Sequence, residues 1–304
     1  MSKISRFPIL ALLLALPPAA YPAPPSETPS VVTTIKPLHA LAGSVAGNIL
    51  EPALLLHQQQ SPHDYRLTPS AARLLGTSDL VVWVGPGLET QLAIPLQGLA
   101  PPERRLDLAL RPEMKLLPLR GGGTWEGEHE HAERADADSH LWLDADNALA
   151  ILDILQARLG KLDPAHAGSY RQNAARAASD IRAADAAIRQ LLETARPRPY
   201  WVLHDSLQYF EKRYGLEGAG AIMVNPDRIP GAKRVLELRG QLRTQNIGCI
   251  LYEERYGRRW IEVLIEDSNV KAIPIDPLGL ELEEGADFYP KLLFNLAQQI
   301  AQCH

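Results

Sequence analysis

Short apolar runs alternate along the chain with longer segments in which apolar residues recur at helical spacing. The runs that predict β-strands are Val31–Ile35, Leu50–Leu56, Leu80–Gly85, Arg105–Leu110, Tyr200–Leu203, Ala219–Val224, Cys249–Glu253 and Val270–Ile275. The helical segments between them include Leu38–Gly47, Ser70–Leu75, Arg228–Asn246 and Arg258–Ser268. This alternation is typical of parallel sheets covered by helices. We therefore expect an α/β protein with two lobes, each a four-stranded parallel sheet flanked by helices.

One long helix is predicted between the two sets of strands. Asp163–Pro164 is a typical helix start, and the alanine-rich segment that follows contains no further proline. Residues 163–195 at 1.5 Å each give a helix of roughly 48 Å, long enough to cross both lobes. We expect it to join an N-terminal lobe, residues 31–162, rigidly to a C-terminal lobe, residues 196–304. Two helices with a kink near Gly168 are the alternative.

The first residues predict an export signal rather than a part of the fold. Lys3 and Arg6 precede an apolar run, Phe7–Leu16, that is too short to cross a bilayer core of about 30 Å. We interpret residues 1–23 as a cleaved signal peptide and residues 24–30 as a proline-rich leader, which predicts a periplasmic protein. An uncleaved N-terminal membrane anchor is the alternative.

Composition and charge narrow the class of protein further. A chain of 304 residues with 46% hydrophobic and 22% charged residues fits two globular lobes and excludes a disordered chain. The net charge of −5 gives no reason to expect nucleic acid as a partner. Cys249 and Cys303 are the only cysteines, and in an oxidising compartment they allow one disulfide between them. Two unpaired buried thiols are the alternative.

Four metal-capable side chains stand at or near the ends of predicted elements, where open α/β sheets place their ligand sites. His63 follows the second predicted strand, and His140 follows an acidic segment. His204 and Asp276 directly follow the fifth and eighth strands. Two come from each half of the chain, so a metal bound by all four would sit in the cleft between the lobes. Three imidazoles and one carboxylate form a near-tetrahedral zinc sphere. We expect no ligands among His39, His57, His166 and His304.

Two other acidic segments are candidates for a lesser role. Residues 120–139 begin with glycines and continue with acidic residues, His129 and His131, without an apolar period. This pattern predicts a mobile loop with at most weak metal binding. The pair Glu253–Glu254 ends the seventh predicted strand, where it would support a ligand, act as an additional ligand or simply be solvated. The sequence contains no HExxH, CxxC, EF-hand or phosphate-loop motif.

Several stretches of the chain resemble a known family. They are Thr34–His39, Ser61–Tyr65, Leu80–Gly85, His140–Asp144, His204–Asp205 and Ile275–Gly279. Together they make the mature chain similar to the periplasmic zinc-binding proteins of ABC-type zinc uptake transporters, a group of the metal-binding solute receptors. The resemblance implies two α/β lobes joined by one long rigid helix, with the metal bound between them.

The same resemblance implies the metal ligands and the partner. It maps the ligands to His63, His140 and His204, with Asp276 or water in the fourth place. It implies that the protein carries Zn²⁺ to a permease in the inner membrane, and we expect it to act as a monomer without enzymatic activity.

The chain also departs from the family pattern. Pro62 stands where some zinc receptors have a glutamate, which favours Asp276 as the fourth ligand, and Glu253–Glu254–Arg255 replaces the usual Glu-Pro-Gln. The acidic loop before His140 is short for a zinc receptor. Members often have a disulfide in the second lobe, to which the pair Cys249–Cys303 is similar.

Other functions remain as alternatives. Manganese receptors of the same group use more carboxylate ligands, whereas three imidazoles favour a later metal such as zinc. Because ligation requires neutral imidazoles, we expect the zinc affinity to fall as the pH drops through about 6.5. A secreted zinc hydrolase would need an open coordination position and a general base, for which Glu253 or Glu254 is the evident candidate. A surface adhesin of the same fold is less favoured, since no cysteine for a lipid anchor lies near the predicted cleavage site.

Overall fold

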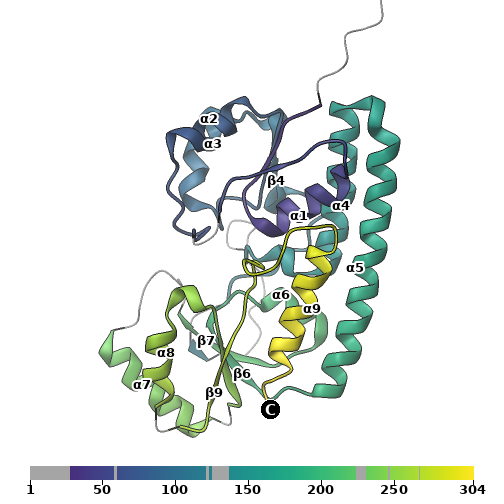
Figure 1. Ribbon diagram of the computed structural model, residues 1–304. Coiled ribbons are helices and arrows are strands. Elements are labelled where there is room, and N and C mark those ends of the chain that lie inside the picture. The colour runs from purple at the N-terminus through teal and green to yellow at the C-terminus, as the bar shows by residue number, and fades with distance from the viewer. Residues whose placement is uncertain are drawn as a thin grey trace, which may run out of the picture.

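The protein consists of two α/β lobes connected along one side by a single long helix (Figure 1). A computed structural model describes residues 28–57, 60–120, 123–124, 137–223, 231–245, 247–266 and 268–304. The predicted signal peptide and the loop histidines His129 and His131 lie outside these residues. In the part of the chain that is described, no helix has both the length and the apolar character needed to cross a membrane.

The N-terminal lobe is built on four parallel strands in the order β2-β1-β3-β4. Its elements are β1 (Val31–Thr33), α1 (Lys36–Ala46), β2 (Ala53–Leu54), α2 (Pro69–Thr77), β3 (Leu80–Trp83), α3 (Ala93–Leu99), β4 (Arg105–Asp107) and α4 (Ala145–Leu162), with 3₁₀ turns at Thr90–Leu92, Pro102–Arg104, Leu108–Leu110 and Leu141–Leu143. Helices α1 and α4 lie between the sheet and the long helix, and α2 and α3 lie on the other side (Figure 1). Both β1 and β3 are buried at every position, which is why these strands read as unbroken apolar runs.

The C-terminal lobe has a five-stranded sheet in the order β5-β7-β6-β8-β9. Its elements are β5 (Gly123–Thr124), β6 (Tyr200–His204), α6 (Gln208–Tyr214), β7 (Gly218–Met223), α7 (Ala232–Thr244), β8 (Cys249–Tyr252), α8 (Arg258–Ile265), β9 (Lys271–Pro274) and α9 (Phe288–Ile300), with a 3₁₀ turn η7 at Glu254–Tyr256. The four predicted strands are parallel and confirm the expected sheet. The fifth strand, β5, pairs antiparallel with β7. It was not predicted, because two residues in a glycine-rich segment carry no alternating pattern.

The long helix is confirmed as α5, Ala167–Ala195, preceded by a 3₁₀ turn at Pro164–His166. Its 29 residues correspond to about 44 Å, and Figure 1 shows it running beside both lobes. Asp163 does not cap a backbone N–H, because its carboxylate accepts hydrogen bonds from the side chains of His166 and Tyr170 instead. The helix ends at Arg196, which adopts the left-handed conformation with φ 44°.

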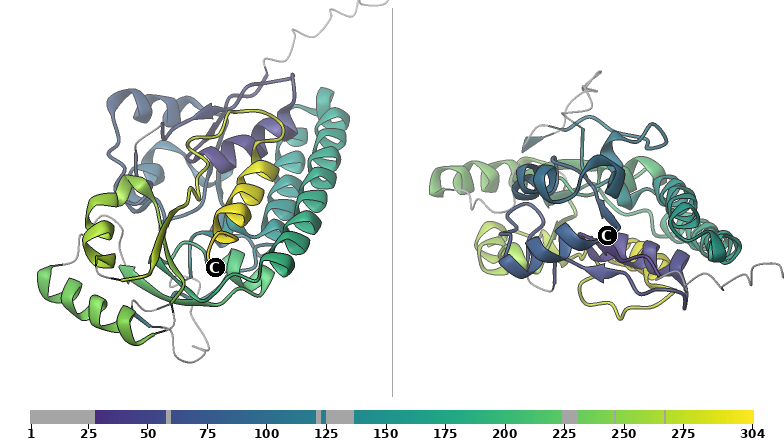
Figure 2. Two further views of the ribbon diagram at one scale, coloured as in Figure 1. Left: turned by 60° about the horizontal axis from the view of Figure 1, so that its bottom comes forward. Right: turned by 90° about the horizontal axis from the view of Figure 1, so that it is seen from above.

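One hydrophobic core runs through both lobes. It contains the strands of the N-terminal sheet, the inner faces of α1, α4 and α5, helix α9, and alternate residues of the C-terminal sheet such as Tyr200 and Val202 of β6. Helix α9 packs against both α5 and α1, so the last helix of the chain joins the two lobes (Figure 2). The other face of β6, with Trp201 and Leu203, packs into a separate cluster under α7 and α8.

The predicted disulfide between Cys249 and Cys303 is confirmed, with the two Cα atoms 5.6 Å apart. Cys249 is the first residue of β8, and Cys303 follows α9. Both cysteines are completely buried. The bond therefore fixes the segment after α9 to β8, an inner strand of the C-terminal sheet.

Candidate metal centre

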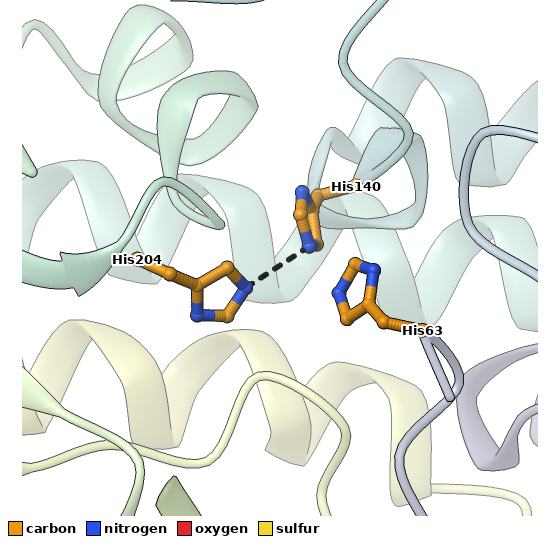
Figure 3. Close-up of side chains that lie close together, drawn as sticks. All are labelled: His63, His140 and His204. Carbon is orange, nitrogen blue, oxygen red and sulfur yellow. Dashed lines mark hydrogen bonds between the residues drawn. The ribbon is translucent and has the colours of Figure 1, made fainter. Parts of the chain in front are cut away.

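Three histidines from three separate segments converge between the lobes (Figure 3). One potential ligand atom from each of His63, His140 and His204 can be chosen so that all three lie within 4.8 Å of one another. His63 comes from the loop between β2 and α2, His140 stands just before the 3₁₀ turn that leads into α4, and His204 is the last residue of β6. The ring centroids are 5.3 to 5.7 Å apart. This arrangement places three nitrogen donors around one point.

A buried carboxylate orients His204. Strands β6 and β8 are parallel neighbours, so His204 at the end of one lies beside Glu253, which directly follows the other. Nδ1 of His204 is 3.0 Å from Oε1 of Glu253. Burial alone would raise the pKa of Glu253, but His204 and the nearby Arg255 outweigh it and hold that pKa below its usual range. With a carboxylate at Nδ1, the other ring nitrogen of His204 faces the site, 3.4 Å from Nε2 of His140.

A second buried carboxylate orients His140. Oδ1 of Asp138 accepts hydrogen bonds from the backbone N–H of His140 at 2.9 Å and from its ring Nδ1 at 2.8 Å. With the Asp138 carboxylate at Nδ1, Nε2 is the ring nitrogen of His140 that faces the site, 3.4 Å from Nε2 of His204. Burial alone would lower the pKa of His140, but the charges of Asp138 and Glu253 outweigh it and raise that pKa.

The loop that carries His63 is attached to the C-terminal lobe. The hydroxyl of Ser61 accepts a hydrogen bond from the N–H of His63 at 3.2 Å and lies 3.1 Å from the hydroxyl of Tyr256. Arg255 donates to the carbonyl of Gln60 at 3.3 Å. Burial, with the neighbouring His140, His204 and Arg255, holds the pKa of His63 well below its ordinary value. The ring of His63 is therefore neutral, as a metal ligand must be, at neutral pH.

The space between the imidazoles is small and mostly apolar. It is about 10 Å³, enough for one water-sized body. Trp142 and Tyr256 form two of its walls, with ring centroids 5.3 Å from His140 and 5.7 Å from His204. Imidazole nitrogens around a cavity of this size fit a single zinc ion.

Asp276, the fourth predicted ligand, does not join the histidines in this structure. Among the residues that the structure describes, the group of possible ligands contains the three histidines only. Asp276 lies two residues beyond β9, and its Oδ2 accepts a hydrogen bond from the N–H of Glu281 at 3.1 Å. It lines a neighbouring cavity of about 580 Å³, to which Glu253 also belongs. Burial and the charge of Glu253 raise the pKa of Asp276.

The remaining candidate residues lie apart from the centre. Nε2 of His39 is 2.9 Å from the carbonyl of Pro52, and His166 pairs with Asp163. His57 and His304 are exposed. Glu254 is exposed as well, with Arg258 at 3.5 Å. Among the described residues, none of these side chains belongs to the group of possible ligands around the centre.

A cluster of charged residues next to His204 was not predicted from the sequence. Arg120 pairs with both carboxylate oxygens of Asp205 and with Glu211 at 2.7 Å. Burial, opposed by Arg120, raises the pKa of Glu211 to about 7. Since Asp205 follows His204 directly, this cluster fixes the backbone next to that histidine. No local sequence pattern links Arg120 to Asp205 and Glu211, which lie at least 85 positions further along the chain.

Asp138 also escaped the sequence analysis, although a signal was present. A carboxylate two residues before a candidate histidine ligand, with only Ser139 between them, is close enough to bond the ring of His140. For the second carboxylate, Glu253, support of a ligand histidine was one of the three roles that the sequence left open for the pair Glu253–Glu254. Carboxylates that hold the outer nitrogen of ligand histidines are a common feature of metal sites.

Two α/β lobes with three oriented imidazoles between them are the architecture of a metal-ion receptor. The family described as "Zinc-uptake complex component A periplasmic" matches residues 31–303. The chain therefore belongs to this family of periplasmic zinc-uptake components.

Known relatives and structures agree with this assignment. The chain is similar to the high-affinity zinc uptake system protein ZnuA of Paracoccus denitrificans, with 33% identity over 97% of both chains. It is also similar to the ZnuA protein of Brucella abortus (strain 2308), with 29% identity over 91% of this chain and 92% of the relative. A crystal structure of the periplasmic zinc-binding protein TroA from Treponema pallidum has the same fold, with a TM-score of 0.76, 19% identity and coverage of 91% and 99%.

Proposed function

We propose that this protein binds one Zn²⁺ ion between its lobes through His63, His140 and His204 and delivers it to the permease of an ABC-type zinc importer. The observation that carries the proposal is the convergence of the three imidazoles around a cavity that has room for a single ion. Family membership supports the transport role, because the curated relatives are zinc uptake proteins.

The surroundings of the imidazoles support zinc as the ion. Asp138 and Glu253 lie against the outer nitrogens of His140 and His204, which raises the basicity of the nitrogens that face the metal. Their negative charges also offset the charge of a divalent ion in a poorly solvated place. An all-imidazole set favours zinc over manganese, which prefers carboxylate and water ligands.

We propose that Asp276 or a water molecule completes the coordination sphere. In the structure the carboxylate of Asp276 is bonded to the N–H of Glu281, so binding the metal requires this carboxylate to change partners. Glu253 lines both the small cavity between the histidines and the larger neighbouring one, so the two cavities adjoin at that residue.

A receptor accounts for the site better than a zinc hydrolase. A hydrolase needs a free general base beside a metal-bound water. Glu253, the nearest candidate, contacts His204 at 3.0 Å and Arg255 at 3.5 Å, and it supports the histidine instead. We further propose that residues 1–23 direct export to the periplasm and that the mature protein acts as a monomer.

The test is calorimetric titration of the metal-free mature protein with zinc. One tight site per chain is expected, and each of His63→Ala, His140→Ala and His204→Ala should abolish it. His57→Ala is the matched control, because this exposed histidine lies in the same loop as His63 and should leave binding unchanged. Tight binding retained in all three ligand variants would overturn the assignment of the site. Deletion of the gene should slow growth of the host under zinc limitation, and added zinc should restore it.

A further inference from the structure

The connection between β9 and α9 is held from the N-terminal lobe, although β9 belongs to the C-terminal sheet. Lys36, the first residue of α1, is only 8% exposed. Its ammonium group donates hydrogen bonds to the carbonyls of Leu280 at 3.2 Å and Leu282 at 2.6 Å. It also lies 5.2 Å from the ring centroid of Phe288 at the start of α9. One lysine thus ties α1 to residues 276–282, which we name the Asp276 loop.

Two further contacts keep the loop against this side of the molecule. The indole N–H of Trp142 donates to the carbonyl of Pro277 at 2.9 Å. Gly279 has φ 65°, and a Cβ atom there would lie 2.6 Å from the ring of Phe288, so the loop rests directly on that ring. Trp142 and Lys36 both precede the long helix in the chain, so the loop is hydrogen-bonded to residues of the N-terminal half.

The same loop forms part of the metal site. Pro277 and Leu278 line the cavity between the three histidines. Asp276 stands at the beginning of the loop and closes it by accepting the hydrogen bond from Glu281. The wall of the cavity and the candidate fourth ligand consequently depend on how firmly the loop is anchored.

We infer that Lys36 is a positioning residue for metal retention, which holds the Asp276 loop over the cavity so that Pro277 and Leu278 cover the bound ion and Asp276 is kept available as a ligand. This inference rests on the proposed function. Among the described residues, Lys36 forms no hydrogen bond or ion pair with any of the three histidines. Its effect on the metal would therefore pass through the loop.

The test measures how fast zinc leaves the protein. Zinc-loaded wild type, Lys36→Met and Lys36→Arg are mixed with excess chelator in a stopped-flow instrument. Methionine keeps the length of the side chain but cannot bond the two carbonyls, so release should become about tenfold faster, the range found for residues that support metal ligands. Arginine keeps the donors and should restore most of the wild-type rate. Lys291→Met is the matched control, because Lys291 lies on the exposed side of α9 and pairs there with Asp287 at 2.6 Å, away from the Asp276 loop.

A double-mutant cycle tests whether the effect passes through the loop. Asp276→Asn is combined with Lys36→Met, and the two effects on release should be less than additive. Circular dichroism and thermal unfolding of each variant show that the fold is intact. Unchanged or slower release by Lys36→Met, or additive effects in the cycle, would overturn the inference. Failure of the wild-type protein to bind zinc at all would overturn the proposed function instead.

Discussion

Replacing Asp138 tests how much of the zinc affinity depends on the orientation of His140. The side chain of Asp138 is 2% exposed, and one of its oxygens accepts both the ring and the backbone N–H of His140. Asp138→Ala removes both bonds and one buried negative charge. Loss of such a supporting carboxylate costs about 10- to 100-fold in metal affinity. This corresponds to about 1.4–2.7 kcal/mol.

Asp138→Asn separates charge from geometry. The amide oxygen still accepts from the imidazole, but a neutral hydrogen bond is about half as strong as a charge-assisted one. We therefore expect about half of the free-energy loss, or a weakening of about 3- to 10-fold.

The assay for both Asp138 variants is competition with a fluorescent zinc chelator at pH 7.5, alongside thermal unfolding. Asp163→Asn is the matched control, because Asp163 accepts from Nδ1 of His166 in the same way at 2.7 Å but far from the metal centre. It should lower stability and leave the zinc affinity unchanged. Wild-type affinity in Asp138→Ala would refute the reasoning.

Three further predictions concern pH and stability. The pKa of His140 is raised and that of His63 is lowered, so protons compete with zinc first at His140. Affinity should therefore fall about tenfold per competing ring between pH 7.5 and 5.5, and a flat calorimetric profile would contradict the three-histidine site. Replacing Cys249 and Cys303 with alanine removes a disulfide between residues 54 positions apart. This change should lower the free energy of unfolding by about 4 kcal/mol with little change in zinc affinity. Denaturant titration measures this loss, and an unchanged midpoint would disprove it. Arg213→Met should cost about 3 kcal/mol, because it removes the arginine partner of the buried Asp144, which caps α4, and of the partly buried Asp185 on α5. A change below about 1 kcal/mol in the same titration would show that these carboxylates find other partners.

The strands were predictable because the sheets are covered on both faces. All four residues of β3 are buried, and such strands appear in the sequence as continuous apolar runs. The ends of these strands then located His204 without knowledge of the structure. The short strand β5 was not predictable, since its pairing with β7 depends on the arrangement of the sheet and not on its own two residues.

The positions of the acidic side chains were harder to predict than those of the histidines. Glu253 and Asp276 both follow strands of the same sheet, yet the carboxylate of Glu253 lies against the ring of His204 and that of Asp276 accepts a hydrogen bond from the backbone of its own loop. Register and loop geometry decide between these outcomes, and neither is visible as a sequence pattern. The link between Arg120 and Asp205 joins positions 85 residues apart and depends wholly on the tertiary fold.

The continuous core through both lobes has a consequence for recognition by a transporter. Because α5 and α9 belong to the same packed interior as both sheets, we expect the receptor to keep nearly the same outline with and without its cargo. A permease cannot then distinguish the loaded from the empty form by a change in overall shape. It must sense a local difference at the mouth of the site, where the segments around His63 and Pro277 meet. We therefore expect the permease to tell the loaded from the empty receptor by the positions of a few surface residues rather than by closure of the two lobes.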